Sequence, residues 1–147
     1  MRRPVWLHSL AVGLGRRSGI WLLGLLLWAG VLFMLSADSA PPSGPDFPFK
    51  DKLLHCAYFS GGAFCAAMAW ATTSRSKRLR FGGSLVIVGL VFAAVLGALD
   101  EWHQSFTPGR MGNDPGDWLA DFTGGLLGGW LAAHFVRWIS PVNASAD

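Results

Sequence analysis

The chain has 147 residues, of which 52% are hydrophobic and only 14% are charged. Soluble domains carry about 25% charged residues, so this composition excludes an ordinary soluble domain and indicates a membrane protein. Its eight tryptophans fit side chains that anchor helices at two lipid–water interfaces. The net charge of +3 does not indicate a nucleic-acid partner, because the charges segregate along the chain as described below.

Four apolar segments each approach the length of about 20 residues that a membrane-spanning helix needs. Backbone polar groups in lipid must bond to one another within the chain, so we predict helices rather than strands. We expect the helices at about residues 19–36, 51–73, 82–104 and 117–139. The predicted fold is an all-α, four-helix transmembrane bundle. Paired glycines in the last segment, at 124 and 128 and at 125 and 129, suit close helix packing.

The length of the chain fits a single domain. We place the membrane domain at residues 19–139, after a basic N-terminal tail at 1–18 and before a short tail at 140–147. The first apolar segment also resembles a secretory signal peptide, with "SADSA" at residues 36–40 as a loose cleavage site. Its basic region and apolar run are both long for such a signal, which favours a retained helix.

The distribution of charge predicts the orientation of the helices. Nine of the twelve Lys and Arg residues lie before the first helix, between the second and third, or near the end of the fourth. Eight of the nine acidic residues lie at the opposite end of the bundle. Positive residues collect on the cytoplasmic side of a membrane, so we predict cytoplasmic termini in the inner (cytoplasmic) membrane. The acidic end then faces outward, toward the periplasm or the exterior.

Polar residues gather at the outward end of three predicted helices. Ionisable groups near membrane depth are costly and usually face the bundle interior or a wet cavity. Residues four apart in a helix share one face, which applies to several of these residues. We therefore expect one outward polar pocket, with these candidate site residues: Asp51, Lys52, His55, Asp100, Glu101, Gln104, Arg110, Asp117 and Asp121.

The candidate residues have the groups that chemistry on a phosphate-linked lipid requires. As catalytic candidates, His55 oriented by Asp51 can move a proton near neutral pH, and the adjacent Asp100 and Glu101 can act as acid or base. The predicted substrate-binding residues are Lys52, Gln104, Arg110, Asp117 and Asp121. A cation such as Mg²⁺ could bridge the carboxylates to a phosphate, but no ligand spacing is diagnostic. The metal and any cofactor therefore stay undetermined.

Structural roles compete with these functional ones. Asp51 and Asp117 also fit helix caps, and Lys52 fits a side chain that reaches lipid phosphate. Asp100, Glu101 and Arg110 also fit an internal salt-bridge network that holds the helices together. An ion-conducting role is weaker, because the charges lie at one end of the spans only.

At these residues the chain resembles the VanZ-like family of small bacterial membrane proteins. The first motif, D-K-x-x-H, is formed here by Asp51, Lys52 and His55, followed by Tyr58 and Phe59. The second, D/E-E-x-x-Q-x-F-x-P-x-R, is formed by Asp100, Glu101, Gln104, Phe106, Pro108 and Arg110. The third, D-x-x-A-N/D-x-x-G-x-x-x-G, is formed by Asp117, Ala120, Asp121, Gly124 and Gly128. Asp121 stands where many members carry Asn.

The resemblance covers about residues 20–140 and implies a four-helix membrane fold with an outward polar pocket. It also implies action on lipid head groups or polyprenyl-linked carriers. Two hypotheses follow. The protein either acts on a phosphate-linked lipid at the outer leaflet, or is a non-catalytic binding or accessory protein for cell-envelope precursors or antibiotics. The expected partner is a membrane lipid or lipid-linked precursor, and the sequence does not determine the oligomeric state.

Overall fold

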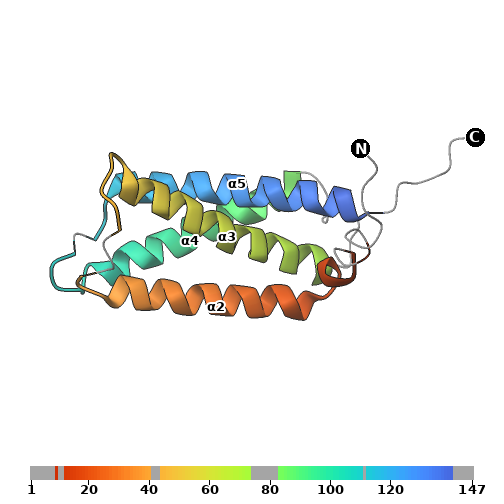
Figure 1. The fold of residues 1–147 in the computed structure, drawn as a ribbon, viewed down its shortest axis with the longest axis horizontal. Helices are drawn as coiled ribbons and strands as arrows, with labels where there is room; N and C mark the ends of the chain where they lie inside the picture. Colours follow the sequence, from red (N-terminus) through yellow and green to blue (C-terminus); the bar gives the residue numbers. More distant parts are fainter. Residues whose placement is uncertain (1–8, 10–11, 41–43, 74–82, 111, 141–147) are drawn as a thin grey trace, which may run out of the picture.

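The computed structural model describes residues 9, 12–40, 44–73, 83–110 and 112–140. The regular elements in these residues are all helical, which confirms the predicted all-α class. The four long helices are α2 (Ser18–Ala37), α3 (Lys50–Thr73), α4 (Gly83–Gln104) and α5 (Pro115–Ile139). Their ends differ from the predicted ends by at most two residues. The helices lie side by side with alternating direction (Figure 1).

Three of the helices, α2, α3 and α4, are long and apolar enough to cross a membrane. This supports the prediction of a membrane protein. α5 has 25 residues but carries two aspartates and one arginine, and its crossing stays a prediction. Most of the basic residues behind the predicted orientation, at 1–8 and 74–82, lie outside the described residues, as does the tail at 141–147. Within the predicted N-terminal tail, residues 12–15 are helical.

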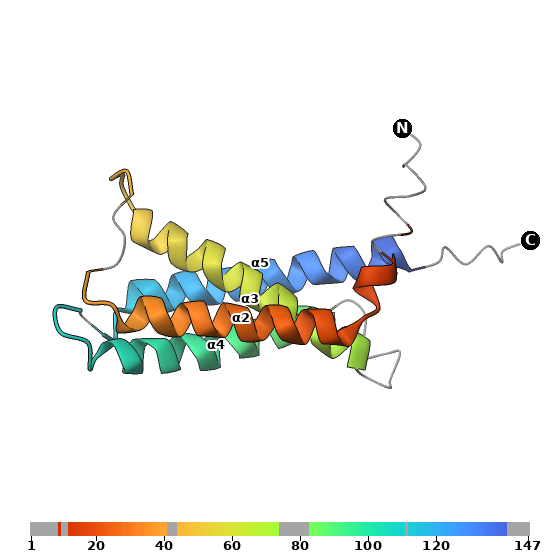
Figure 2. The same cartoon turned by 60° about the horizontal axis from the view of Figure 1, so that its bottom comes forward.

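The alternating helix directions bring the end of α2, the start of α3, the end of α4 and the start of α5 to one end of the bundle. We call it the site end. Both views show the connections after α2 and after α4 at this end (Figure 2). At the opposite end the start of α2 meets the end of α5, where the rings of Trp21 and Phe135 lie 6.2 Å apart.

Glycines on two sides of α5 let it pack between α3 and α4 at backbone distance. A Cβ atom added to Gly128 would lie 2.9 Å from the Ala63 Cβ of α3. One added to Gly129 would lie 2.6 Å from the Leu85 carbonyl oxygen of α4. Gly124 faces α3 and Gly125 faces α4 in the same way. The predicted role of the paired glycines in packing is therefore confirmed, and each pair serves a different neighbour.

The two halves of the bundle bury different kinds of side chain. Away from the site end, the core is apolar and is formed by Ala67, Met68, Ala71, Leu85, Ala132, Ala133 and Val136. Toward the site end, fully buried side chains include the polar Ser36 and Asp121. Buried polar groups need partners, so this half of the structure depends on hydrogen bonds and ion pairs.

Reciprocal contacts hold α2 against α3 below the site end. The Trp28 indole donates to the Tyr58 carbonyl at 2.9 Å, and the Tyr58 hydroxyl donates to the Trp28 carbonyl at 2.6 Å. The two rings stack with centroids 5.1 Å apart. α2 therefore packs against α3 as part of the bundle.

Candidate functional site

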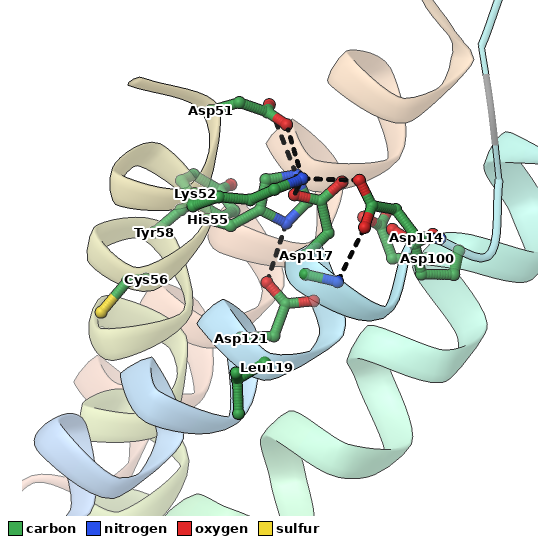
Figure 3. Close-up of polar contacts among 12 residues, drawn as sticks. Asp51, Lys52, His55, Cys56, Tyr58, Asp100, Asp114, Asp117, Leu119 and Asp121 are labelled. Atoms are coloured by element: carbon green, nitrogen blue, oxygen red, sulfur yellow. Dashed lines mark hydrogen bonds and ion pairs between the residues drawn. The ribbon is translucent and has the colours of Figure 1, made fainter. Parts of the chain in front are cut away.

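The polar residues of the site end form two clusters. The lysine cluster joins the start of α3 to the start of α5 (Figure 3) and consists of Asp51, Lys52, His55, Asp114, Asp117 and Asp121. The arginine cluster joins the ends of α2 and α4 to the loop after α4 and consists of Ser36, Asp100, Gln104, Thr107 and Arg110.

The local sequence Asp-Pro-Gly sets the start of α5 and thereby positions its acidic residues. Asp114 is the N-cap, and its carboxylate accepts a hydrogen bond from the Gly116 amide at 2.7 Å. Proline is favoured in the first turn, where its missing N–H is not needed. Asp117 then lies in the first helical turn, where the helix dipole favours a carboxylate. Both carboxylates face α3.

Lys52 neutralises these carboxylates. Its ammonium lies 2.6 Å from both Asp114 and Asp117, and 3.3 Å from Asp51. The sequence left open whether Lys52 contacts a phosphate or reaches toward lipid. The structure places it between protein carboxylates, so it is already paired. The hydrogen bond from Lys52, and then that from the Gly116 amide, hold the pKa of Asp114 below its ordinary value of 3.8.

The lowered pKa of Asp114 predicts a dependence of stability on pH. A carboxylate with a lowered pKa in the folded state stabilises the fold at neutral pH, and this contribution is lost as the pH falls through its folded-state pKa. We expect the melting temperature of the wild type to fall more than that of Asp114→Asn as the pH is lowered from 7 toward about 3. Parallel melting curves for the two proteins across this range would contradict the assignment.

Asp121, rather than Asp51, orients His55. The Nδ1 atom of His55 lies 2.8 Å from Asp121 Oδ1, and Asp121 is 0% exposed. Asp51 Oδ1 lies 3.9 Å from His55 Nε2, and the Asp51 side chain is 67% exposed. The expectation that Asp51 orients His55 is therefore wrong. The shared helix face brings Asp51 near the ring, but the carboxylate from α5 is closer and buried.

A tight turn after α4 directs Arg110 back to the site. Residues 107–110, Thr-Pro-Gly-Arg, close a turn in which the Arg110 amide donates to the Thr107 carbonyl at 3.1 Å. Gly109 has a φ of 80°, a conformation that glycine adopts without strain, and proline precedes it as this turn type favours. The Arg110 guanidinium then donates to the Gln104 side-chain oxygen at 2.8 Å.

The arginine cluster continues as a chain of hydrogen bonds into α2. The Gln104 amide donates to Asp100 at 2.7 Å, which confirms that these residues share a face. Asp100 also accepts a hydrogen bond from the Ser36 hydroxyl. The Thr107 hydroxyl donates to the Ser36 carbonyl at 2.9 Å. The cluster therefore fixes the end of α2 and the loop after α4 around the Asp100 carboxylate.

Glu101 belongs to neither cluster. One of its carboxylate oxygens accepts a hydrogen bond from the Asp114 amide at 2.7 Å, while the other, Oε1, is buried without a partner among the described residues. Asp100 faces α2 instead. The two adjacent carboxylates reach different partners because consecutive residues of a helix point in directions about 100° apart.

The two clusters meet at a cavity of about 670 Å³. Six of the nine predicted site residues line it, namely Asp51, Lys52, His55, Asp100, Gln104 and Arg110. Glu101, Asp117 and Asp121 do not line it and support the residues that do. Most of the remaining lining is apolar or aromatic, namely Leu32, Leu35, Phe47, Phe49, Leu54, Tyr58 and Phe59. The cavity therefore combines an apolar wall with a polar, charged one.

Several site residues were not among the sequence-predicted ones. Ser36, Asp46 and Lys50 line the cavity, and Asp114 contacts Lys52. Ser36 could have been found as the one hydroxyl in an otherwise apolar helix segment, and Asp114 from the helix-start pattern Asp-Pro. Asp46 lies in a proline-rich loop, and Lys50 follows this loop. The sequence of the loop did not indicate that it passes the cavity.

Comparisons with family models, curated proteins and solved structures found no match.

Proposed function

We propose that the protein is a VanZ-like multi-pass protein of the cytoplasmic membrane that acts on the head group of a phosphate-linked lipid, either a phospholipid or a polyprenyl phosphate carrier. The head group enters the cavity at the site end, which faces the outer leaflet. This assignment combines the sequence motifs with the cavity. The observation that carries it is the lining, where apolar side chains adjoin an arginine and a histidine.

Arg110 is the cation of the cavity wall whose geometry best suits a phosphate, although Lys50, which donates to the Gly44 carbonyl, also lines the cavity. Among the described residues, no carboxylate forms an ion pair with its guanidinium, whose side-chain hydrogen bond goes to the neutral Gln104. A guanidinium offers five donors in a fork that fits two phosphate oxygens. Lys52, by contrast, contacts three carboxylates. The phosphate therefore binds at Arg110, and Gln104 holds the guanidinium in place.

His55 is the proton-transfer group. Asp121 is the hydrogen-bond partner of Nδ1. Nε2 is therefore the ring nitrogen that can exchange a proton with a ligand. His55 lines the same cavity as Arg110. Hydrolysis or transfer of a head group needs at least a cation that binds the phosphate and a group that transfers protons. His55 and Arg110 provide these two groups. The buried Asp121 stabilises the imidazolium that such a transfer forms.

A non-catalytic binding or accessory role is the second candidate. The observation that favours it is the lysine cluster itself, in which Lys52 and His55 join α3 to three carboxylates at the start of α5. Such a cluster can serve to fix the helices around a cavity that only binds its ligand. The ligand would then be a lipid-linked envelope precursor or an antibiotic.

Comparison of membrane lipids by mass spectrometry tests the proposal. Cells with wild-type protein are compared with cells that contain His55→Ala at equal protein level. His103→Ala is the matched control, because His103 lies at the site end too, in the last turn of α4, but stacks on Phe33 of α2 and does not line the cavity. We expect a phosphate-linked lipid to change with the wild type and His103→Ala but not with His55→Ala. Identical profiles in all three, with folded proteins, would reject an enzyme and favour the binding role.

A further inference from the structure

The lysine cluster contains three ligand-type atoms that no hydrogen bond joins to one another. His55 Nε2 lies 3.8 Å from Asp117 Oδ1 and 3.9 Å from Asp51 Oδ1. Each of the three residues offers one ligand atom, and these atoms all lie within 4.8 Å of one another. Imidazole and carboxylate ligands bind Zn²⁺ at about 2.0–2.2 Å, so two ligands of one ion lie at most about twice that length apart. Both distances from His55 fall within that span.

The support behind His55 is the kind that metal-binding histidines have. Such a histidine usually donates its other ring N–H to a carboxylate, which fixes the tautomer and the ring orientation. Asp121 is placed to do this, 2.8 Å from Nδ1, and Nε2 lies on the side of Asp51 and Asp117 (Figure 3). A general base has the same support, so this feature alone does not distinguish the two roles.

The balance of buried charge is a second, independent observation. Asp121 Oδ2, on a side chain that is 0% exposed, has no partner among the described residues, and neither does Glu101 Oε1. The lysine cluster itself contains four carboxylates, those of Asp51, Asp114, Asp117 and Asp121, but only one lysine and one histidine. A cluster with more carboxylates than cations can accept a further cation, which would offset the cost of its buried negative charge.

We infer that Asp51, His55 and Asp117 form a binding site for a divalent transition-metal ion, with Asp121 as the residue that positions His55. The imidazole ligand favours Zn²⁺ and similar ions over Mg²⁺ and Ca²⁺, which prefer oxygen ligands alone. Three protein ligands leave a coordination position open, as in catalytic zinc sites. Asp51 and His55 line the cavity, so a phosphate oxygen of the proposed substrate can take that position.

Lys52 competes with the metal ion. Its ammonium lies 2.6 Å from Asp117 Oδ1, the atom that would bind the metal. Lys52 also contacts Asp114 at 2.6 Å and can keep that partner when a metal takes Asp117. Lys52→Met removes the competing charge and keeps an unbranched side chain. The metal site therefore predicts tighter metal binding by this variant, a result that a merely structural salt-bridge cluster does not give.

Titration of the detergent-purified full chain with Zn²⁺, without added lipid, tests the inference. We expect stoichiometric binding that excess Mg²⁺ does not prevent, and an affinity loss of about tenfold or more in Asp51→Asn and His55→Gln. Asp51 is largely exposed, so its replacement leaves the fold intact. Asp46→Asn is the matched control, because Asp46 lines the cavity outside the cluster, and it should bind as the wild type does.

The outcomes separate this inference from the proposed function, on which the role of the open position rests. No stoichiometric Zn²⁺ binding by folded wild type and folded Lys52→Met would overturn the metal site, as would unchanged affinity in Asp51→Asn. Zn²⁺ binding with the expected losses, but no lipid changed in cells by the wild type, would keep the metal site and reject the lipid chemistry. A lipid changed in cells without any Zn²⁺ binding would do the reverse.

Discussion

Gly129→Ala is expected to lower the free energy of unfolding by about 1–3 kcal/mol, the usual cost of overpacking a tight core. The added methyl group would lie 2.6 Å from the Leu85 carbonyl oxygen and 2.8 Å from the Val86 Cα atom, both of which belong to the α4 backbone. A flexible side chain could move aside, but a helix backbone can yield only by moving α4 away from α5. Unfolding in detergent by titration with a denaturing detergent measures this change.

Gly61→Ala is the matched control for this prediction. Gly61 also lies within a helix, α3, but an added Cβ atom there meets nothing within 4 Å. Alanine favours a helix over glycine by about 1 kcal/mol, so Gly61→Ala should leave stability unchanged or raise it. Equal effects at the two positions would show that close contact of α5 with α4 does not govern the stability of the bundle.

Arg110→Gln is expected to weaken binding of a polyprenyl phosphate by about 10–100-fold, because hydrogen bonds to a charged group contribute about 1.5–3 kcal/mol each. Arg110→Lys should lose less, since it keeps the charge but not the two-pronged geometry. The free polyprenol, which lacks the phosphate, should bind all three proteins equally. Titration of purified protein with each lipid, followed by native mass spectrometry, gives these affinities.

A control at the opposite end of the bundle separates site binding from general attraction to anionic lipid. Arg137 lies exposed near the end of α5, far along the helix from the site end, and does not line the cavity. Arg137→Gln should leave polyprenyl phosphate binding unchanged. A loss equal to that of Arg110→Gln would mean that the lipid responds to total positive charge rather than to the cavity.

The sequence predicted the helices well because their physical signal is strong. Long apolar segments need no tertiary information to be recognised, and each observed helix begins and ends within two residues of the predicted one. The gathering of polar residues at one end followed from alternating helix directions. Six of the nine predicted residues line one cavity at that end. Which membrane the protein occupies and which way it faces stay predictions.

The partners of individual side chains could not be predicted, because they depend on how each helix is rotated about its axis. Spacing of four residues placed Asp51 beside His55, but it could not show that Asp121 of another helix lies closer. Likewise, Asp100 and Glu101 are neighbours in the sequence, and only packing against α2 and α5 sends them to different partners. Residue type indicated the site, and helix rotation determined the roles within it.

The position of α5 in the bundle has a consequence for biogenesis. This helix is the last of the four to be synthesised, yet it supplies both the glycine surfaces that join α3 to α4 and the carboxylates that pair with α3. Until α5 has been synthesised, Lys52 and His55 lack these partners. The carboxylates that pair with Lys52 and His55 from α5 are therefore in place only after this last helix has been synthesised.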